Sequence, residues 1–250
     1  MYLDNNTLPK AKKVHVRSAW PYTVLRDFVS LFFPNGCLAC DQSLVREEVW
    51  LCTYCLDQLP QTAYHQVLNN AVAQKFYGRL PIQQAMSLYI FRKDSAVQKL
   101  LYALKYAHQP AIGKALGQRY GALLKASTQL PSTLDLIVPV PLHTTRLRAR
   151  GYNQSDFFAE GLATSLNIPW SNQCLHRTRA TTTQTNKDRT ARFQNVAKAF
   201  ASNAQAVCGK RLLLVDDVVT TGATLEACGT TLLAAGASEI SIATIAAAEF

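Results

Sequence analysis

The segment Leu212–Thr224, LLLVDDVVTTGAT, constrains the fold of this 250-residue chain more than any other feature. Its first four residues, Leu212–Val215, are all apolar, which is typical of a strand buried on both faces. Two carboxylates, Asp216 and Asp217, follow, and a short polar turn then opens a helix expected over 223–235. A buried strand that leads through a turn into a helix predicts an α/β domain with a parallel sheet.

The turn after the two carboxylates has the composition of an anion-binding site. Backbone N–H groups at a helix N-terminus attract negative charge, and threonine hydroxyls add donors. Gly222 permits close approach of the backbone to a ligand, so a phosphate monoester fits the turn. Asp216 and Asp217 would repel that phosphate but suit vicinal ribose hydroxyls, directly or through Mg²⁺. A simple helix cap would explain Thr220 but not the paired acids.

The remainder of the chain after residue 80 alternates strands and helices. Apolar residues recur at helical spacing in some segments and run continuously in others. The expected elements are an edge strand over 86–91, helices over 96–107 and 112–126, a strand over 135–140, a helix over 155–166 and a last strand over 240–246.

Four cysteines form two pairs with metal-ligand spacing, Cys37-x2-Cys40 and Cys52-x2-Cys55. Two such knuckles complete a tetrahedral shell of thiolates, which predicts a structural zinc ion with no open position for chemistry. A redox CxxC or a pair of disulfides are the alternatives, and disulfides are uncommon in chains without an export signal. The isolated cysteines are expected to be buried small apolar residues: Cys174, Cys208 and Cys228.

Charge is unevenly distributed along the chain. The formal net charge is +10, and residues 143–211 hold eleven Lys and Arg against three acids. Such a cluster favours phosphates, diphosphates or nucleic acid as ligands. We find no export signal and no apolar run long enough to span a membrane, and expect a cytoplasmic protein. The expected organisation is a loose arm over 1–21, a four-cysteine module over 22–61 that includes an amphipathic helix over 24–33, and a larger domain over 62–250.

The loop expected over 141–151 is basic and follows a predicted parallel strand. Loops at the carboxyl ends of such strands are where open α/β sheets bind ligands. Arg146 and Arg150 suit a diphosphate there, Gly151 leaves room for it, and Arg148 is a weaker candidate. For any one arginine, a solvated charged face is the alternative.

These motifs together resemble a known family. Positions 212–224 are similar to the phosphoribosyl-pyrophosphate (PRPP) signature of type I phosphoribosyltransferases: four apolar residues, two acids, two apolar residues and TTGAT. The segment 138–143 (VPVPLH), Arg146, the segment 150–154 (RGYNQ) and the four cysteines extend the resemblance to the ComF/GntX family, which includes competence proteins for DNA uptake. The resemblance covers most of residues 25–248.

The resemblance implies a type I phosphoribosyltransferase fold, a parallel sheet flanked by helices, with a small N-terminal zinc-knuckle module. It implies that Asp216 and Asp217 contact the ribose of PRPP, with Mg²⁺, and that a loop over 176–195 closes over the reaction. The implied 5′-phosphate residues are Thr220, Thr221, Gly222, Ala223 and Thr224. The implied pyrophosphate residues are Arg146, Arg150 and Gly151. The implied catalytic cations of the closing loop are Arg177, Arg179, Lys187 and Arg189.

Three functions follow as hypotheses. The first is transfer of phosphoribose from PRPP to a nitrogenous, base-like acceptor with release of pyrophosphate, although no residue is identified that reads the acceptor. The second is binding of single-stranded DNA or of the DNA-uptake machinery, with the basic loops along the phosphates and Tyr152 and Phe193 either stacking on bases or lying in the core. The third is a PRPP-sensing regulator without turnover. Trp50 and Tyr54 either contact nucleic acid or pack the zinc module. The sequence does not indicate an oligomeric state.

Overall fold

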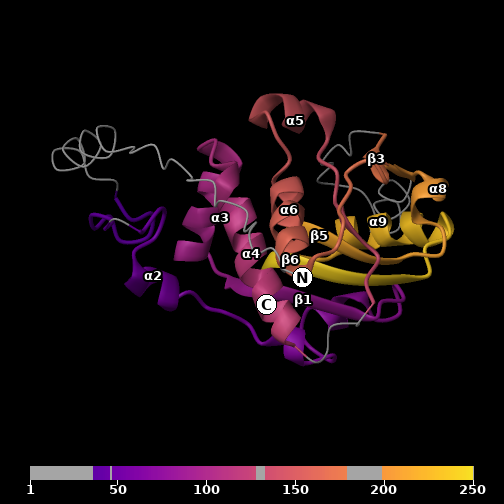
Figure 1. Ribbon diagram of the computed structural model, residues 1–250, viewed down its shortest axis with the longest axis horizontal. Helices are drawn as coiled ribbons and strands as arrows, with labels where there is room; N and C mark the ends of the chain where they lie inside the picture. The colour runs from indigo at the N-terminus through magenta and orange to yellow at the C-terminus, as the bar shows by residue number, and fades with distance from the viewer. Residues whose placement is uncertain (1–35, 46, 128–132, 179–198, 250) are drawn as a thin grey trace, which may run out of the picture.

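The centre of the molecule is a four-stranded parallel sheet (Figure 1). The computed structural model describes residues 36–45, 47–127, 133–178 and 199–249. The strand order is β1 (Gln84–Phe91), β6 (Glu239–Ala248), β5 (Arg211–Val219) and β2 (Leu136–Pro139). β1 lies at an edge, as expected, and the segment around Trp170 adds an isolated parallel bridge to Ile137 beside β2.

Helices and short turns surround the sheet. In chain order these are α2 (Thr53–Asp57), η1 (Tyr64–Gln66), η2 (Ala73–Phe76), α3 (Ala96–Tyr106), α4 (Pro110–Ala126), α5 (Thr144–Arg150), α6 (Gln154–Leu166), α8 (Ala204–Val207) and α9 (Ala223–Ala234). A small antiparallel ribbon of β3 (Leu175–Arg177) and β4 (Phe200–Ser202) lies beside α9.

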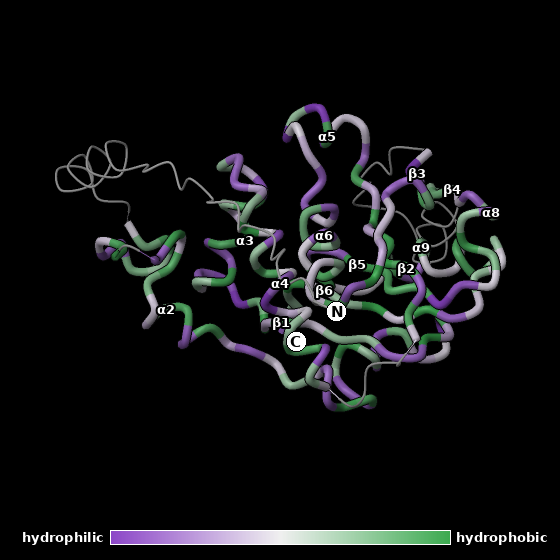
Figure 2. Tube along the Cα trace, in the orientation of Figure 1, coloured by the Kyte–Doolittle hydropathy of each residue, from purple (hydrophilic) through white to green (hydrophobic). Residues whose placement is uncertain are grey.

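The apolar strands are buried because helices cover both faces of the sheet. Leu213 and Val215 of β5 belong to a cluster with α3, α4 and α6. Leu212 and Leu214 alternate to the opposite face, where they pack with η2, α9 and the β3–β4 ribbon. Apolar colouring accordingly follows the central strands in Figure 2. The expected α/β class with a covered parallel sheet is confirmed.

Two glycines bring α4 and α6 into close contact. An added Cβ at Gly117 would lie 2.3 Å from the carbonyl oxygen of Phe158, and one at Gly161 would lie 2.1 Å from that of Lys114. Any side chain at these positions would force the helices apart. This packing fixes the N-terminal turn of α6, which contains Ser155, against the end of β5.

The structure departs from two expected elements. β5 continues past Val215 to Val219, because Val218 and Val219 still pair with β6. The expected loop over 141–151 is wrong, since α5 occupies most of it. The side chain of His143 caps this helix by accepting from the N–H of Thr145, and Gly151 ends it in the left-handed region at φ 81°.

The four-cysteine segment packs on the same core as α3 and α4. Cys37 and Leu51 belong to the apolar cluster of those helices. Lys99 donates to the carbonyl of Ala39 at 2.8 Å, and Trp50 Nε1 donates to Gln109 Oε1 at 2.8 Å. The partly buried Trp50 therefore has a packing role in this segment.

Other expectations for single residues have mixed outcomes. Tyr54 is 73% exposed, so it does not pack the cysteine segment. Cys174 and Cys228 are buried as expected, but Cys208 is exposed and the expectation for it is wrong. The arm over 1–21 and the amphipathic helix expected over 24–33 lie outside the described residues. Among the helices that the structure describes, none is long and apolar enough to cross a membrane.

Candidate functional site

Two chain segments meet at the carboxyl edge of the sheet. β2 and β5 are neighbours in register, with Pro139 opposite Val215, and the N–H of Val140 donates to the carbonyl of Val215 at 2.9 Å. The segments that follow these two strands therefore leave the sheet side by side, and they carry the phosphate and pyrophosphate residues that the sequence predicts.

The turn after β5 forms a small hollow at the start of α9. Gly222 lies in the left-handed region at φ 79° and is the N-cap of the helix, and Thr220 and Thr221 are exposed. The first N–H groups of a helix have no partner within it, so they are available to an anion. The hollow measures about 50 Å³, and its lining residues are Asp216, Val218, Val219, Thr220, Thr221, Gly222, Ala223, Thr224 and Leu225.

The two carboxylates at the end of β5 contact different helices. Asp216 Oδ1 accepts from Ser155 Oγ at 2.9 Å and from the N–H of Asp217 at 2.8 Å. Burial and the neighbouring charge of Asp217 raise the pKa of Asp216 to about 7. Without a ligand, Asp216 is thus held between its neutral and ionised forms near neutral pH.

Asp217 forms an ion pair with a lysine that the sequence does not assign to the site. Lys105 Nζ, near the end of α3, lies 2.6 Å from Asp217 Oδ2. In the sequence Lys105 reads as an ordinary polar position on an amphipathic helix, and no spacing links it to Asp217. An ammonium group already contacts this carboxylate. A cation or a ribose hydroxyl that binds there must therefore displace Lys105 or share the carboxylate with it.

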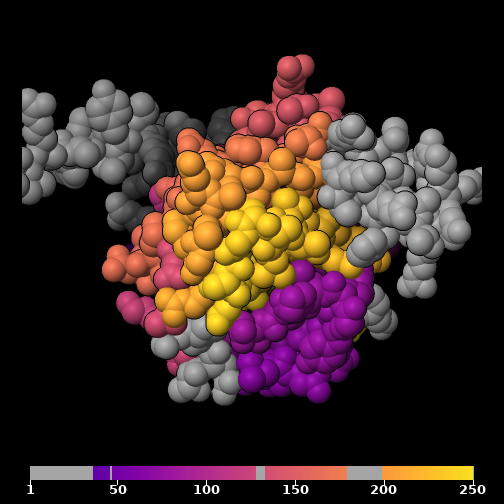
Figure 3. Space-filling model, turned by 90° about the vertical axis from the view of Figure 1, so that its right-hand side faces the viewer, coloured from indigo at the N-terminus to yellow at the C-terminus, as the bar shows by residue number. Residues whose placement is uncertain are grey.

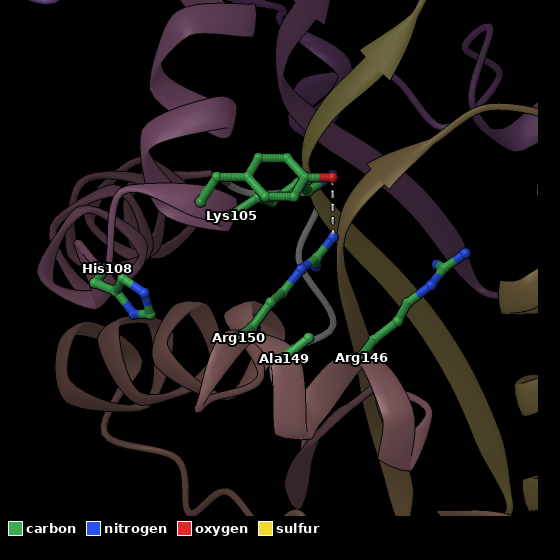
Figure 4. A pocket seen from close by; sticks show the side chains of 6 residues that line it. Lys105, His108, Arg146, Ala149 and Arg150 are labelled. Atoms are coloured by element: carbon green, nitrogen blue, oxygen red, sulfur yellow. Dashed lines mark hydrogen bonds between the residues drawn. The ribbon is translucent and has the colours of Figure 1, made fainter.

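A larger basic pocket opens next to this ion pair, between the end of α3 and α5 (Figure 4). Its volume is about 490 Å³, and its lining residues are Lys105, Tyr106, His108, Arg146, Ala149 and Arg150. Arg146 and Arg150, predicted for pyrophosphate, are thus brought together, whereas Arg148 does not line the pocket. The sequence predicts none of the lining residues from α3 or the loop after it.

Arg150 and Gly151 differ in how they are held. Arg150 donates to Gln154 Oε1 at 2.9 Å and to the hydroxyl of Tyr106 at 3.4 Å, and its guanidinium lies 5.1 Å from the Tyr106 ring centre. An added Cβ at Gly151 would meet nothing within 4 Å. Gly151 therefore ends α5 and lies at the border of the pocket without lining it.

Arg177 is the one predicted closing-loop cation that the structure describes. It lies on β3, partly buried, with its guanidinium 5.3 Å from the ring centre of Phe200. Burial and the charge of Arg146 lower its pKa, while Cys228 and Asp216 act in the opposite direction. The charge of Arg177 therefore interacts with Arg146 on α5 and with Asp216 on β5.

The remaining predicted cations, Arg179, Lys187 and Arg189, lie outside the described residues. The residues on either side of that segment are close together, since the N–H of Thr178 donates to the carbonyl of Ala199 at 2.8 Å. Thr178 and Ala199, the described residues on either side of positions 179–198, are therefore in contact at the end of the β3–β4 ribbon.

The four cysteine sulfurs converge on one point. All four lie within 4.8 Å of one another, and the Sγ atoms of Cys40 and Cys52 are 3.8 Å apart. Four thiolates at about 2.3 Å from one zinc ion would lie about 3.8 Å apart. Backbone N–H groups also point at the sulfurs, as Cys52 N donates to Cys37 Sγ at 3.3 Å.

The electrostatics of this cluster favour a bound cation. Burial and the neighbouring thiols raise the pKa of Cys55 to about 12. The pKa of Cys37 is about 6, because backbone hydrogen bonds outweigh the effect of burial. Without a cation, the cluster does not hold four thiolates together at neutral pH. The donor set therefore fits a structural zinc ion.

Comparison with known proteins identifies a matching domain and two sequence relatives. Residues 155–249 match the family model described as "Phosphoribosyl transferase domain". The chain is 36% identical over 146 residues to the DNA utilization protein YhgH of Salmonella typhi, which covers 57% of this chain and 63% of that protein. It is 38% identical over 110 residues to Competence protein F of Haemophilus influenzae, which covers 43% of this chain and 48% of that protein.

The matches span less than two thirds of the length of these relatives. Among solved structures, one that is similar is the glutamine phosphoribosylpyrophosphate amidotransferase of B. subtilis. The match covers 58% of this chain and 30% of that chain, with 22% sequence identity and a TM-score of 0.41. The sequence relatives confirm the resemblance to the ComF/GntX family. Residues 155–249 therefore carry a phosphoribosyl transferase domain, and the chain is similar to proteins named for DNA utilization and for competence.

Proposed function

We propose that this protein binds PRPP with Mg²⁺ and transfers its 5-phosphoribosyl group to a nitrogenous acceptor, with release of pyrophosphate. The observation that carries the proposal is the meeting of three groups at one sheet edge. They are the phosphate-sized turn after β5, the carboxylates Asp216 and Asp217, and the basic pocket with Arg146 and Arg150. A 5-phosphate, a ribose and a diphosphate need these three environments in that order.

The chemistry follows from the charges. The bond between the anomeric carbon and the diphosphate oxygen breaks, the acceptor nitrogen bonds to that carbon, and the nitrogen releases its proton to solvent. The turn 220–224 anchors the phosphate, and Asp216 and Asp217 accept hydrogen bonds from the ribose hydroxyls and stabilise positive charge on the ring. Arg146 and Arg150 stabilise the departing diphosphate. Asp217 would hold Mg²⁺ together with the diphosphate, and the ion would supply further neutralisation of charge.

The closing segment completes the proposal. Arg177, together with Arg179, Lys187 and Arg189, would cover the diphosphate when the segment 179–198 closes over it and excludes water. Support comes from Arg177, which already lies within electrostatic reach of Arg146 and Asp216.

A thermal-shift titration tests the binding step. PRPP with Mg²⁺ should raise the melting temperature of the wild type, and the double variant Asp216→Asn/Asp217→Asn should lose this response. Asp57→Asn, at an exposed acid on α2, is the control and should keep it. No response in the wild type would overturn the proposal.

Turnover is tested separately, by measuring pyrophosphate release from PRPP with a panel of nitrogenous bases. Release that depends on one base establishes transfer. Stabilisation by PRPP with no release from any acceptor favours instead a PRPP-sensing regulator.

A second candidate function, binding of single-stranded DNA, is supported by an exposed aromatic pair on α3. Tyr102 and Tyr106 are 63% and 56% exposed, and their ring centres lie 4.8 Å apart. Bases stack on such rings, and the arginines of α5 are placed to contact phosphates. Tyr152, in contrast, donates its hydroxyl to the carbonyl of Leu104 and packs edge-on against Phe157. Tyr152 is therefore better explained by packing, and Phe193 lies outside the described residues.

The two candidates respond differently to the same changes. Binding of an oligothymidine should weaken steeply with salt, persist in Asp217→Asn and fall by roughly tenfold in Tyr102→Ala/Tyr106→Ala, since stacking contributes about 1–3 kcal/mol per base. Oligothymidine binding that the tyrosine double variant leaves unchanged would rule out this surface.

We also propose one structural zinc ion at Cys37, Cys40, Cys52 and Cys55. Elemental analysis of metal-replete protein should give about one zinc per chain. Cys40→Ser should lower the zinc content and destabilise the segment 36–59. A protein that is fully folded and metal-free contradicts this assignment.

A further inference from the structure

A segment from the N-terminal half of the chain supports the turn after β5. This segment, residues 70–80, contains η2 and precedes β1. Figure 3 shows the surface of this part of the chain directly against that of the C-terminal part. Leu80 lies so close to Gly229 of α9 that an added Cβ there would be 2.6 Å from the leucine side chain. Phe76 lies against Gly222, since a Cβ on that glycine would be 3.0 Å from the ring.

The segment is itself held rigidly. The side-chain amide of the buried Asn70 donates to the carbonyls of Val67, at 2.7 Å, and Ala85, at 2.9 Å. Its oxygen accepts from the N–H groups of Val72 and Ala73 at 2.9 and 3.0 Å. The asparagine thus ties the start of η2 to β1, so the segment provides a fixed support.

Arg79 extends from this support to the turn. Its Nη1 atom donates to the carbonyl of Thr221 at 3.1 Å and to that of Lys75 at 2.9 Å. Its Nη2 atom donates to Oε2 of Glu226, in the first turn of α9. One guanidinium therefore joins the support, the turn and the helix.

Glu226, the partner of Arg79 in this ion pair, is a buried acid. Its side chain is 2% exposed, whereas that of Arg79 is 38% exposed. Oε1 of Glu226 is buried with no hydrogen-bond partner among the described residues, and Arg79 pairs with Oε2, where its charge compensates that of the buried carboxylate. A buried acid beneath an anion-binding turn would weaken that turn unless its charge were neutralised.

We infer that Arg79 is a positioning residue for the 5′-phosphate. It fixes the carbonyl of Thr221, so that the N–H groups of the turn face the ligand, and it neutralises Glu226 beneath the turn. This inference rests on the proposed function of the turn 220–224. The ligand class is a sugar carrying a terminal phosphate monoester, and Arg79 acts on this end of PRPP and not on its diphosphate.

Calorimetric titrations with ribose 5-phosphate and, separately, with inorganic pyrophosphate test the inference. Arg79→Met should weaken ribose 5-phosphate binding by about tenfold or more, which corresponds to the loss of a charge-assisted hydrogen bond. Pyrophosphate binding should stay unchanged. Arg79→Met should also lower the melting temperature, because Glu226 is then buried without its cation.

A double variant separates positioning from folding. Arg79→Met/Glu226→Met replaces the ion pair with apolar groups, so it should regain melting temperature relative to Arg79→Met. Its ribose 5-phosphate affinity should rise above that of Arg79→Met, because the uncompensated charge of Glu226 is gone, but should stay about tenfold below that of the wild type, because the carbonyl of Thr221 is still unanchored. Arg79→Lys keeps a charge next to Glu226 but has no fork to hold both partners, and should melt near the wild type yet bind less tightly.

The matched control is Arg92→Gln, which breaks an exposed arginine–glutamate pair with Glu249 at the other end of β1. It should leave both ligands and the melting temperature unchanged. Ribose 5-phosphate affinity that returns to the wild-type value together with the melting temperature in the double variant would show a purely structural role and overturn the inference alone. A wild type that binds neither ribose 5-phosphate nor PRPP overturns the inference and the proposed function together.

Discussion

The segments that follow β5 and β2 lie side by side at the sheet edge but are built in opposite ways. After β5 the chain makes a short turn in which Gly222 lies against Phe76 and the carbonyl of Thr221 is held by Arg79. After β2 the chain forms α5, whose residues are mostly exposed, beside a pocket of about 490 Å³ against about 50 Å³ at the turn. The first region is fixed by backbone and packing, and the second presents charges on long side chains.

The difference indicates a division of work. A fixed turn suits one phosphate monoester of constant shape, because its donors need no rearrangement on binding. Long arginine side chains suit a group that changes charge and departs during a reaction. The fixed arrangement of charged groups and backbone around the end of β5 should therefore lower the stability of the protein measurably. The exposed arginines of α5 should not lower it.

Asp216 should show the largest such cost. Its folded pKa of about 7 lies above the ordinary value of 3.8, so between these values the folded state retains a proton that the unfolded chain has lost. Stability is then lost as pH rises from about 4 to about 7. Asp216→Asn should stabilise the protein by up to about 4 kcal/mol above pH 7 and by little near pH 4, measured by denaturant unfolding across pH. An advantage of Asp216→Asn that is the same at every pH would contradict this account.

One left-handed glycine from each of the two regions provides the next test. Gly222 and Gly151 have φ of 79° and 81°, but only the former has a close neighbour, Phe76. Gly151→Ala should cost about 1–2 kcal/mol of stability from backbone strain alone. Gly222→Ala should cost more and should abolish ribose 5-phosphate binding. Equal losses in the two variants would show that the turn is no more tightly fixed than the end of α5.

Removal of a pocket arginine should have a smaller and more selective effect. Arg150→Ala should weaken pyrophosphate binding by about tenfold, the loss of a charge-assisted contact, and leave ribose 5-phosphate binding intact. Calorimetry with the two ligands measures both values. If both affinities fell together, the two regions would not act on separate parts of PRPP.

The smallest effect is expected at Arg148, which lies on α5 outside the pocket lining. Arg148→Ala removes the same charge as Arg150→Ala, so it controls for the general basic field of the helix. Pyrophosphate affinity should change by less than about twofold at physiological salt, where exposed charges are screened. A loss as large as that of Arg150→Ala would mean that net charge, and not the pocket, binds the diphosphate.

Local patterns predicted the main elements closely. The helix expected over 96–107 is α3, which covers 96–106, and the strand expected over 240–246 is the core of β6. The loop expected over 141–151 is wrong, because α5 is short and exposed and has no apolar face to give a periodic pattern, and the loop expected over 176–195 begins within β3. β5 is also longer than predicted, since pairing with β6 continues the strand through the two acids.

The sequence by itself determined the residues that lie next to one another in the chain. These are the buried strand, the paired carboxylates and the glycine turn of 212–224, together with two cysteine pairs at metal-ligand spacing. Their chemistry depends on local spacing and backbone conformation, which adjacent residues specify. Tertiary structure alone decided that Lys105 contacts Asp217, that α3 completes the basic pocket, and that Arg79 bridges the turn and Glu226. Those contacts depend on helix packing and strand order, which join residues far apart in the chain, and no local pattern encodes them.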